Sequence, residues 1–293
     1  MHLSGGLGNQ LFQYAAGLSL AARRGTSLSL ETRKFRKTAG DLEDPAARPL
    51  RILEFQLPHR RICPKDEEAR WRRRWNLSRN LRLPARWLGF YTEKSFSYDP
   101  AFERAPDGVC LRGYFQSELY FTNVARDVRQ AFRPRDESVL QRIDAELASL
   151  RSPGRALVAL HIRRGDFLEL TDRDCMTGDA FLEAAMSFFP GARFLVFSDD
   201  LAWCRVRFAS REDVAFSPFT RVIDDFLAMS RCDHNILAKS TFSWWAAWLN
   251  ETPGRRVVAP HIAPEPSWGG GGPDYYPCDW TVLQGETLSQ ARS

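Results

Sequence analysis

Short apolar runs that alternate with helical stretches are the feature that most constrains the fold of this 293-residue chain. In the second half such runs end at turn residues or charges, and they lie at residues 157–162, 194–197, 234–238 and 257–259. Between them, residues 179–189 and 244–249 fit helices. Strands that alternate with helices form a parallel sheet covered on both faces. The second half is therefore predicted to be an α/β domain.

The first half has weaker periodicity and begins with a glycine-rich turn, GGLGNQ, at residues 5–10. Residues 11–24 then fit a helix, and Gly25 stands where a helix C-terminus favours glycine. Residues 27–31 alternate like a strand. Further helical stretches are predicted within residues 113–132 and over residues 139–150.

Chain length and a break in the pattern indicate two domains. A chain of 293 residues exceeds most single cores and fits two domains of roughly 120 to 170 residues each. Ser152, Pro153 and Gly154 form a turn-like break between helical and strand patterns. We therefore predict an α/β fold of two Rossmann-like domains facing a cleft, over residues 1–151 and 152–293.

Composition is that of a soluble globular protein, with 44% hydrophobic and 26% charged residues. No apolar run approaches the roughly 18 to 20 residues that span a bilayer, and no signal peptide is visible at the start. A cytoplasmic protein is expected. The six cysteines are scattered without a Cys-x-x-Cys spacing, which argues against a structural zinc site.

The glycine-rich turn is the first candidate site, because ligands of open α/β sheets bind beyond the carboxyl ends of strands. Glycines let backbone N–H groups approach an anion at a helix N-terminus. Gly8, Asn9 and Gln10 are therefore predicted to contact an anionic ligand. A rival interpretation is a dinucleotide fingerprint, Gly6-x-Gly8 with Glu31 on a ribose, although Leu11 stands at the third glycine position.

The segment HIRRGD, residues 161–166, ends the first strand of the second half. Two arginines at the end of a strand are costly to desolvate unless an anion pairs with them. A pyrophosphate is a suitable partner for Arg163. Arg164 is open to a second interpretation, an internal ion pair with Asp166.

The acidic residues are not spaced for a metal site. Asp199 and Asp200, in FSDD, are adjacent and would point in different directions. The Asp-x-Asp pair of Asp172 and Asp174 has no strand before it. We therefore predict no metal requirement.

Residues 234–238 lead to a hydroxyl pair, Ser240 and Thr241, at the start of a helix. Such hydroxyls cap the helix, and the same position also binds an anion. The aromatic cluster that follows is more typical of core packing than of base stacking. Phe242 is the one member that we predict as a ligand contact.

Six segments are more specific together than any one of them alone. They are GGLGNQLFQYAAG from Gly5, EKSFSYD from Glu93, GYFQSELYF from Gly113, HIRRGDF from His161, FSDD from Phe197 and MSRCDHNILAKSTFSWWAAWLN from Met229. In this order they resemble the α-1,2-fucosyltransferases of glycosyltransferase family 11. The resemblance implies a GT-B fold, GDP-fucose as donor, a galactose-terminated glycan as acceptor, no cofactor or metal, and inversion at the anomeric carbon.

The resemblance also implies roles for single residues. His161 would help to bind the guanine end, and Arg163 would hold the β-phosphate and stabilise GDP as it leaves. Ser240, Thr241 and Phe242 would contact phosphate and base, and Asn9 would face the donor. An acidic residue ahead of them would read the guanine 2-amino group, which is Asp225 by spacing or Asp224 if the register is off by one.

An inverting transfer also needs a base for the acceptor hydroxyl. Asp166 is our candidate, although a salt bridge to Arg164 would explain it equally well. Glu169 and Asp172 are the alternatives. Residues 1–151 would be the acceptor side and residues 152–293 the donor side.

Residues 60–86 are densely basic and match no motif. Trp71 and Trp75 are four apart, so they share one helical face among arginines, as suits peripheral contact with an anionic membrane. The alternative is a solvated basic helix whose tryptophans pack on the N-terminal domain. Two further functions stay open for the whole chain: an NAD(P)-binding oxidoreductase and a non-catalytic sugar- or polymer-binding protein.

Overall fold

The computed structural model describes residues 1–38, 49–58, 60–165, 178–262 and 271–284. Two compact units divide the chain. The first is Met1–Arg135 with Gly269–Pro277, and the second is Asp136–Trp268 with Cys278–Ser293. No helix in the described residues has the length and apolar character needed to cross a membrane.

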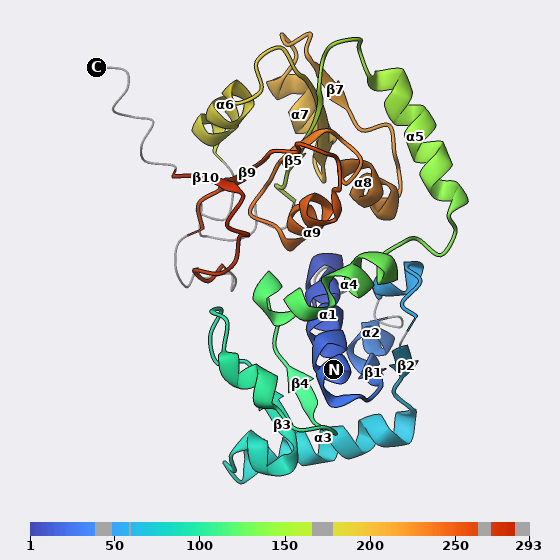
Figure 1. The fold of residues 1–293 in the computed structure, drawn as a ribbon, viewed down its shortest axis with the longest axis vertical. Coiled ribbons are helices and arrows are strands. Elements are labelled where there is room, and N and C mark those ends of the chain that lie inside the picture. The colour runs from blue at the N-terminus through green and yellow to red at the C-terminus, as the bar shows by residue number, and fades with distance from the viewer. Residues whose placement is uncertain (39–48, 59, 166–177, 263–270, 285–293) are drawn as a thin grey trace. The chain divides into compact units, whose positions relative to one another are not determined.

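The second unit is built on a parallel six-stranded sheet of order β10-β9-β8-β5-β6-β7 (Figure 1). Its strands are β5 (Leu157–Ile162), β6 (Arg193–Ser198), β7 (Val214–Phe216), β8 (His234–Ile236), β9 (Val257–Pro260) and β10 (Thr281–Leu283). The helices are α5 (Ser138–Leu150), α6 (Asp179–Ser187), α7 (Leu201–Arg207), α8 (Val222–Met229) and α9 (Thr241–Leu249). The four predicted apolar runs coincide with β5, β6, β8 and β9, so the expected α/β fold is confirmed.

The strand order reverses at β5. From β5 the chain adds β6 and β7 on one side, and it then returns to add β8, β9 and β10 on the other. The carboxyl ends of β5 and β8 therefore form the topological switch point, where open α/β sheets bind ligands.

Alternating side chains of β5 separate the two faces of the sheet. Val158, Leu160 and Ile162 are buried in a core formed with α6 and α7. His161 is one residue out of phase with them, so its side chain lies on the opposite face, where Phe242 of α9 contacts its ring. This arrangement places a histidine inside the unit next to the switch point.

Helix α5 belongs to the second unit, although the turn at residues 152–154 predicted a boundary after it. Arg142 of α5 donates to Asp224 of α8 at 2.9 Å, and Asp144 accepts from Arg231. These ion pairs join residues far apart in the sequence and hold α5 against α8. No local sequence pattern predicts them.

The first unit contains two short parallel pairs, β1 (Leu28–Leu30) with β2 (Arg60–Ile62) and β3 (Phe90–Thr92) with β4 (Cys110–Arg112). Residues 1–3 join the pairs, since His2 N donates to Leu111 O and Leu3 N donates to Glu31 O, both at 3.0 Å. The other elements are α1 (Leu7–Arg24), α2 (Arg33–Thr38), η1 (Ile52–Glu54), α3 (Lys65–Asn80), η2 (Ala85–Leu88), η3 (Pro100–Arg104), η4 (Glu118–Tyr120), η5 (Thr122–Val124) and α4 (Ala125–Ala131). The predicted helix over residues 11–24 begins earlier, at Leu7, and ends at the predicted Gly25, which has a left-handed φ of 61°.

Candidate functional site

The switch point of the second unit brings together four of the residues predicted to bind the donor. His161 lies in β5 and Arg163 follows it, whereas Ser240 is the N-cap of α9 and Phe242 lies in its first turn. Because β5 and β8 are hydrogen-bonded neighbours, the segments that follow them meet. The motifs HIRRGD and AKSTF, distant in sequence, form one site.

Ser240 connects the arginine to the helix. Nη1 of Arg163 donates to Oγ of Ser240 at 3.2 Å, and the same oxygen accepts from the backbone N of Phe242 at 3.2 Å. The capping role predicted for Ser240 is confirmed, and the same hydroxyl also orients Arg163, whereas its contact with an anion stays a prediction. A half-buried guanidinium beside a helix N-terminus is suited to bind phosphate.

His161 is held neutral at this site. Its ring lies 5.6 Å from that of Phe242, and its side chain is buried. Burial, and then the charge of Arg163, lower the pKa of His161 to about 3. Among the described residues its buried Nδ1 has no hydrogen-bond partner. The positive charge of the site thus comes from Arg163, and His161 offers a neutral hydrogen-bonding group.

Asp225 lies near the same aromatic residues. It precedes Phe226, whose ring is 5.3 Å from Phe242, and its Oδ1 accepts from the hydroxyl of Ser217. Burial raises the pKa of Asp225 to about 6, which the Ser217 hydrogen bond opposes and Asp224 reinforces. A half-buried carboxylate with one oxygen fixed is suited to accept from a ligand N–H.

Asp224, the alternative register, has a different role. It is buried and accepts from Arg142 at 2.9 Å, so it fastens α8 to α5. The geometry therefore favours Asp225 over Asp224 as the ligand contact.

Arg164 is a structural residue. Its backbone N donates to Asp199 at 2.8 Å, its Nε donates to Asp200 at 3.3 Å, and its guanidinium lies 3.8 Å from the Trp203 ring centroid. Asp200 also caps α7 by accepting from Trp203 N at 3.0 Å. The sequence predicted an internal ion pair of Arg164 with Asp166. Among the described residues the acidic partner of Arg164 is Asp200, because β6, which precedes Asp200, pairs with β5.

The candidates for general base, Asp166, Glu169 and Asp172, lie outside the described residues, as does Asp174. Their roles stay predictions. Within the described part of the chain no group of three or more His, Cys, Asp or Glu side chains could hold a metal ion.

The glycine-rich turn opens α1 in the first unit. Gly6 is the N-cap without a side-chain hydrogen bond, Gly8 is buried in the first turn, and Asn9 is half-buried. Oδ1 of Asn9 accepts from Nε2 of Gln116 at 2.9 Å. Asn9 is thereby held by the motif GYFQSELYF.

Gln10 does not fit its predicted role in ligand binding. Its side chain is fully buried, its Nε2 donates to Gly5 O and Pro49 O at 3.0 Å, and its Oε1 accepts from Ile52 N at 3.1 Å. These contacts use the amide to join two loops. Gln10 is a structural residue.

Substitution of Gln10 by methionine should therefore lower stability and spare ligand affinity. The change removes the partners of three backbone groups, and it leaves the buried N–H of Ile52 unpaired at a cost of about 1–3 kcal/mol. Thermal unfolding and GDP titration of the variant measure the two effects, with Gln130→Met, at an exposed position, as control. An unchanged melting temperature with weakened GDP binding would return Gln10 to the ligand site.

Sequence reasoning assigned no role to three residues that hold the N-terminal motifs together. Glu93 accepts from Tyr114 N at 2.7 Å and Phe115 N at 2.9 Å, and Gln13 donates to Gly113 O at 2.9 Å. Gln116, which holds Asn9, is the third. A Cβ on Gly113 would lie 2.4 Å from Cβ of Glu93, which explains the glycine. The sequence signal that could have found these three residues is that each is a polar residue within one of the quoted motifs.

The family follows from comparison with known proteins. A sequence model of glycosyltransferase family 11 matches residues 105–283, more than half of the chain. The chain belongs to glycosyltransferase family 11. It is therefore a glycosyltransferase. The matched residues include both segments of the switch-point site, HIRRGD and AKSTF.

Curated relatives of this family 11 glycosyltransferase cover most of its length. An alpha-1,2-colitosyltransferase of Escherichia coli is 28% identical over 88% of this chain and 89% of its own. The O-antigen biosynthesis glycosyltransferase WbnK of Escherichia coli is 27% identical over 88% and 92%. Galactoside alpha-(1,2)-fucosyltransferase 1 of Lagothrix lagotricha is 27% identical over 96% and 76%.

Solved structures similar to this family 11 chain include two glycosyltransferases. Fucosyltransferase NodZ from Bradyrhizobium is 18% identical, covers 84% of this chain and 90% of its own, and has a TM-score of 0.44. ADP-heptose lipopolysaccharide heptosyltransferase II of Escherichia coli is 14% identical over 97% and 88%, with a TM-score of 0.46.

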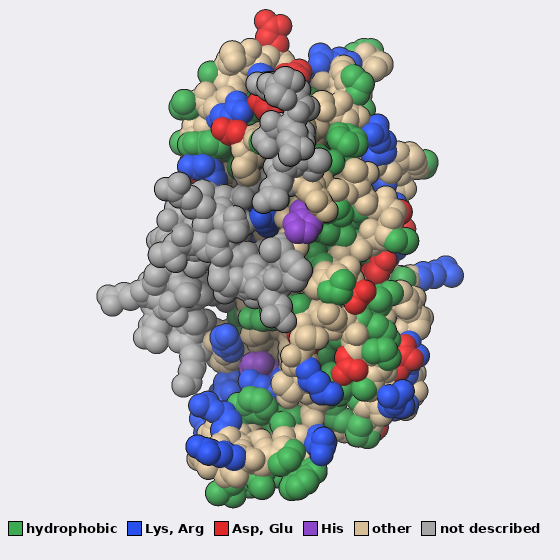
Figure 2. Space-filling model, turned by 90° about the vertical axis from the view of Figure 1, so that its left-hand side faces the viewer, with side chains coloured by type: hydrophobic (Ala, Val, Ile, Leu, Met, Phe, Trp, Pro, Cys, Tyr) green, Lys and Arg blue, Asp and Glu red, His purple; other side chains and the backbone are tan. Residues whose placement is uncertain are grey.

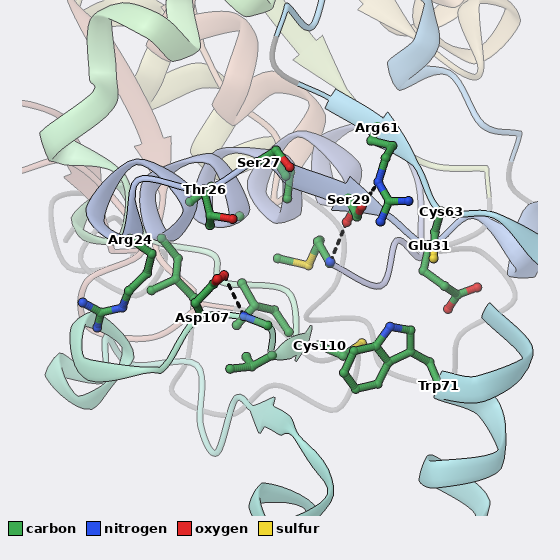
Figure 3. A pocket seen from close by; sticks show the side chains of 18 of the residues that line it. Arg24, Thr26, Ser27, Ser29, Glu31, Arg61, Cys63, Trp71, Asp107 and Cys110 are labelled. Carbon is green, nitrogen blue, oxygen red and sulfur yellow. Dashed lines mark hydrogen bonds between the residues drawn. The ribbon is translucent and has the colours of Figure 1, made fainter. Parts of the chain in front are cut away.

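A cavity of about 280 Å³ in the first unit of this family 11 enzyme bears on the dinucleotide alternative (Figure 3). Glu31 lines it, but the Gly6-x-Gly8 turn does not. The Glu31 carboxylate instead accepts from Arg33 N at 2.9 Å and contacts the His2 ring, and these contacts help to hold its pKa low against burial. Neither the family nor this cavity supports an NAD(P)-binding oxidoreductase, and the family does not support a non-catalytic binding protein.

Proposed function

We propose that this enzyme transfers L-fucose from GDP-fucose to the 2-hydroxyl of a galactoside, with inversion and without a metal. The observation that carries the proposal is the site at the switch point of a family 11 chain, where Arg163 is held by Ser240 beside His161 and Phe242. The names of the relatives, an α-1,2-colitosyltransferase and galactoside α-(1,2)-fucosyltransferases, support the linkage and the sugar class.

Each residue of the site has a role in donor binding under this proposal. Arg163 binds the β-phosphate, with Thr241 and the N-terminus of α9 contributing hydrogen-bond donors. His161 and Phe242 bind the nucleoside, and Asp225 accepts from the guanine 2-amino group. Asn9 stays a predicted donor contact.

The bonds, the electron pair and the proton of the proposed reaction balance as follows from its two reactants. The acceptor oxygen forms a bond to C1 of fucose on the side opposite GDP, and the C1–O bond to the β-phosphate breaks. Its electron pair stays on the phosphate oxygen, where Arg163 stabilises the charge, and the hydroxyl proton passes to a base. Because the His161 pKa of about 3 makes the imidazole neutral near pH 7, Arg163 is the cationic group that can stabilise the leaving GDP.

The base is the second part of the mechanism. We assign it to Asp166, with Glu169 and Asp172 as alternatives, and its contribution would be about 10²- to 10⁴-fold. The N-terminal domain would supply the acceptor side. The cytoplasmic location expected from the sequence stays a prediction.

A donor panel tests the proposed function. Hydrolysis without acceptor should be fastest with GDP-fucose among GDP-fucose, GDP-colitose, GDP-mannose and UDP-sugars, and transfer to a β-galactoside should give a 2-linked product. The same rates should persist in excess EDTA, since Arg163 supplies the charge that a metal would otherwise neutralise. A preference for UDP-sugars would refute the donor, and a requirement for added Mg²⁺ or Mn²⁺ would refute the metal-free mechanism.

A further inference from the structure

Residues 69–88, which follow the acidic first turn of α3 and continue through η2, contain seven arginines and no acidic residue. All seven are exposed: Arg70, Arg72, Arg73, Arg74, Arg79, Arg82 and Arg86. None of them forms a salt bridge with the part of the chain that the structure describes. Elsewhere in the chain arginines commonly pair with acids, as Arg61 does with Glu67 at 2.7 Å and Arg211 with Asp213 at 2.7 Å. The positive charge of this segment is therefore not neutralised by acidic side chains of the described residues.

Two of the three tryptophans of this segment, Trp71 and Trp75, are half-buried against the rest of the first unit. Trp71 and Trp75 pack edge-on against Phe90 with ring centroids at 5.3 and 5.1 Å, and Arg112 lies 4.0 Å from the Trp75 ring. The alternative considered from the sequence, that they pack on the N-terminal domain, is confirmed. Because both side chains are half-buried in these contacts, they are not the most exposed apolar groups of the segment.

Other apolar side chains take the outward positions. Leu77 is 45% exposed, Leu81 is 60% exposed and Trp87 is 67% exposed. Arg70, Arg73 and Arg74 precede Leu77 by seven, four and three residues, so they share its helical face, and Leu81 continues this face beyond the helix end. Figure 2 shows hydrophobic and basic side chains side by side at the lower end of the molecule, where Figure 1 places α3.

We propose that the basic-apolar surface formed by Arg70, Arg73, Arg74, Leu77 and Leu81, together with exposed Trp87 of the adjoining η2, docks on an anionic lipid bilayer. Unpaired guanidinium groups complement headgroup phosphates and carboxylates, and exposed leucine and tryptophan side chains gain by entering the headgroup–acyl boundary. A polynucleotide would satisfy the arginines but would offer nothing to the two leucines. The inference does not depend on the proposed transfer reaction.

Vesicle cosedimentation tests the proposal on the full chain. The protein should sediment with phosphatidylcholine vesicles that contain phosphatidylserine, should not sediment with phosphatidylcholine alone, and should lose binding at high salt. The charge variant Arg70→Gln/Arg73→Gln/Arg74→Gln should bind at least tenfold more weakly, because each arginine near an anionic surface contributes about fivefold. The apolar variant Leu77→Ser/Leu81→Ser/Trp87→Ser should also bind at least tenfold more weakly while it keeps the salt dependence.

The matched control replaces three exposed arginines of the same unit, Arg104, Arg126 and Arg133, by glutamine. It should sediment like the parent protein, and all variants should keep the parent's circular dichroism and donor hydrolysis rate. Equal sedimentation with both lipids, or equal losses in the control and charge variants, would overturn the proposal. Binding of an RNA oligonucleotide that the charge variant loses and the apolar variant keeps, without vesicle binding, would assign the surface to nucleic acid.

Discussion

Replacement of Arg163 by alanine is expected to lower transfer about 100- to 1,000-fold, the loss typical when one preorganised group that stabilises developing charge is removed. Charge builds on GDP as the C1–O bond breaks, and His161 cannot take over because its pKa of about 3 makes it neutral near pH 7. Arg163→Lys should recover part of the activity, since it keeps a charge but not the planar fork. Initial rates with GDP-fucose and a galactoside acceptor measure the effect.

The fold should tolerate this change. Arg163 is half-buried, so its removal should shift the melting temperature little. Arg205→Ala is the matched control, because Arg205 is an exposed arginine of the same unit that lies 4.7 Å from the Phe216 ring and outside the site. Near-normal turnover of Arg163→Ala with an intact fold would remove this residue from the leaving-group role.

Replacement of Asp225 by asparagine is expected to weaken GDP binding about 10- to 150-fold, the equivalent of roughly 1.5 to 3 kcal/mol for a charge-assisted hydrogen bond. Inosine diphosphate lacks the 2-amino group, so its affinity should change little. The parent protein should prefer GDP over inosine diphosphate, and the variant should bind both alike. Calorimetric titration with the two nucleotides gives the ratio directly.

The same ratio should depend on pH. Burial raises the pKa of Asp225 to about 6, so the ligand-free carboxyl gains a proton as the pH falls through that value and loses its ability to accept from guanine. The preference for GDP should therefore decline below about pH 6 in the parent protein and stay flat in Asp225→Asn. Taking the ratio cancels the ionisation of the phosphates, which both nucleotides share.

The unfolding of the two aspartate variants is the control for the assignment of Asp225. A carboxyl whose folded pKa lies above its unfolded value stabilises the fold at low pH and loses that contribution as the pH rises through the folded pKa. Asp225→Asn should consequently unfold no earlier than the parent protein at pH 7. Asp224→Asn should unfold earlier, because it weakens the ion pair between a buried carboxylate and the exposed Arg142. Loss of the GDP preference in Asp224→Asn alone would show that the assignment is off by one residue.

The sequence by itself determined the four strands of the second unit in which most residues are buried, β5, β6, β8 and β9. β5 has six consecutive buried residues, and its apolar run could be delimited without a structure. β7 and β10 were missed because each is only three residues long and its residues are half-buried or exposed. Ser240 was predictable as a cap, because capping is a contact between near neighbours in the chain.

Tertiary structure decided which side chains meet. Gln10 looked like a ligand donor beside two glycines, but its side-chain hydrogen bonds go to Gly5, Pro49 and Ile52. Arg164 was open between a ligand and Asp166, and it contacts Asp200 because β6 pairs with β5. Local sequence determines periodicity and helix caps, because both depend on residues that are neighbours in the chain. The partner of a polar side chain depends instead on strand order. Strand order is set by burial over the whole unit.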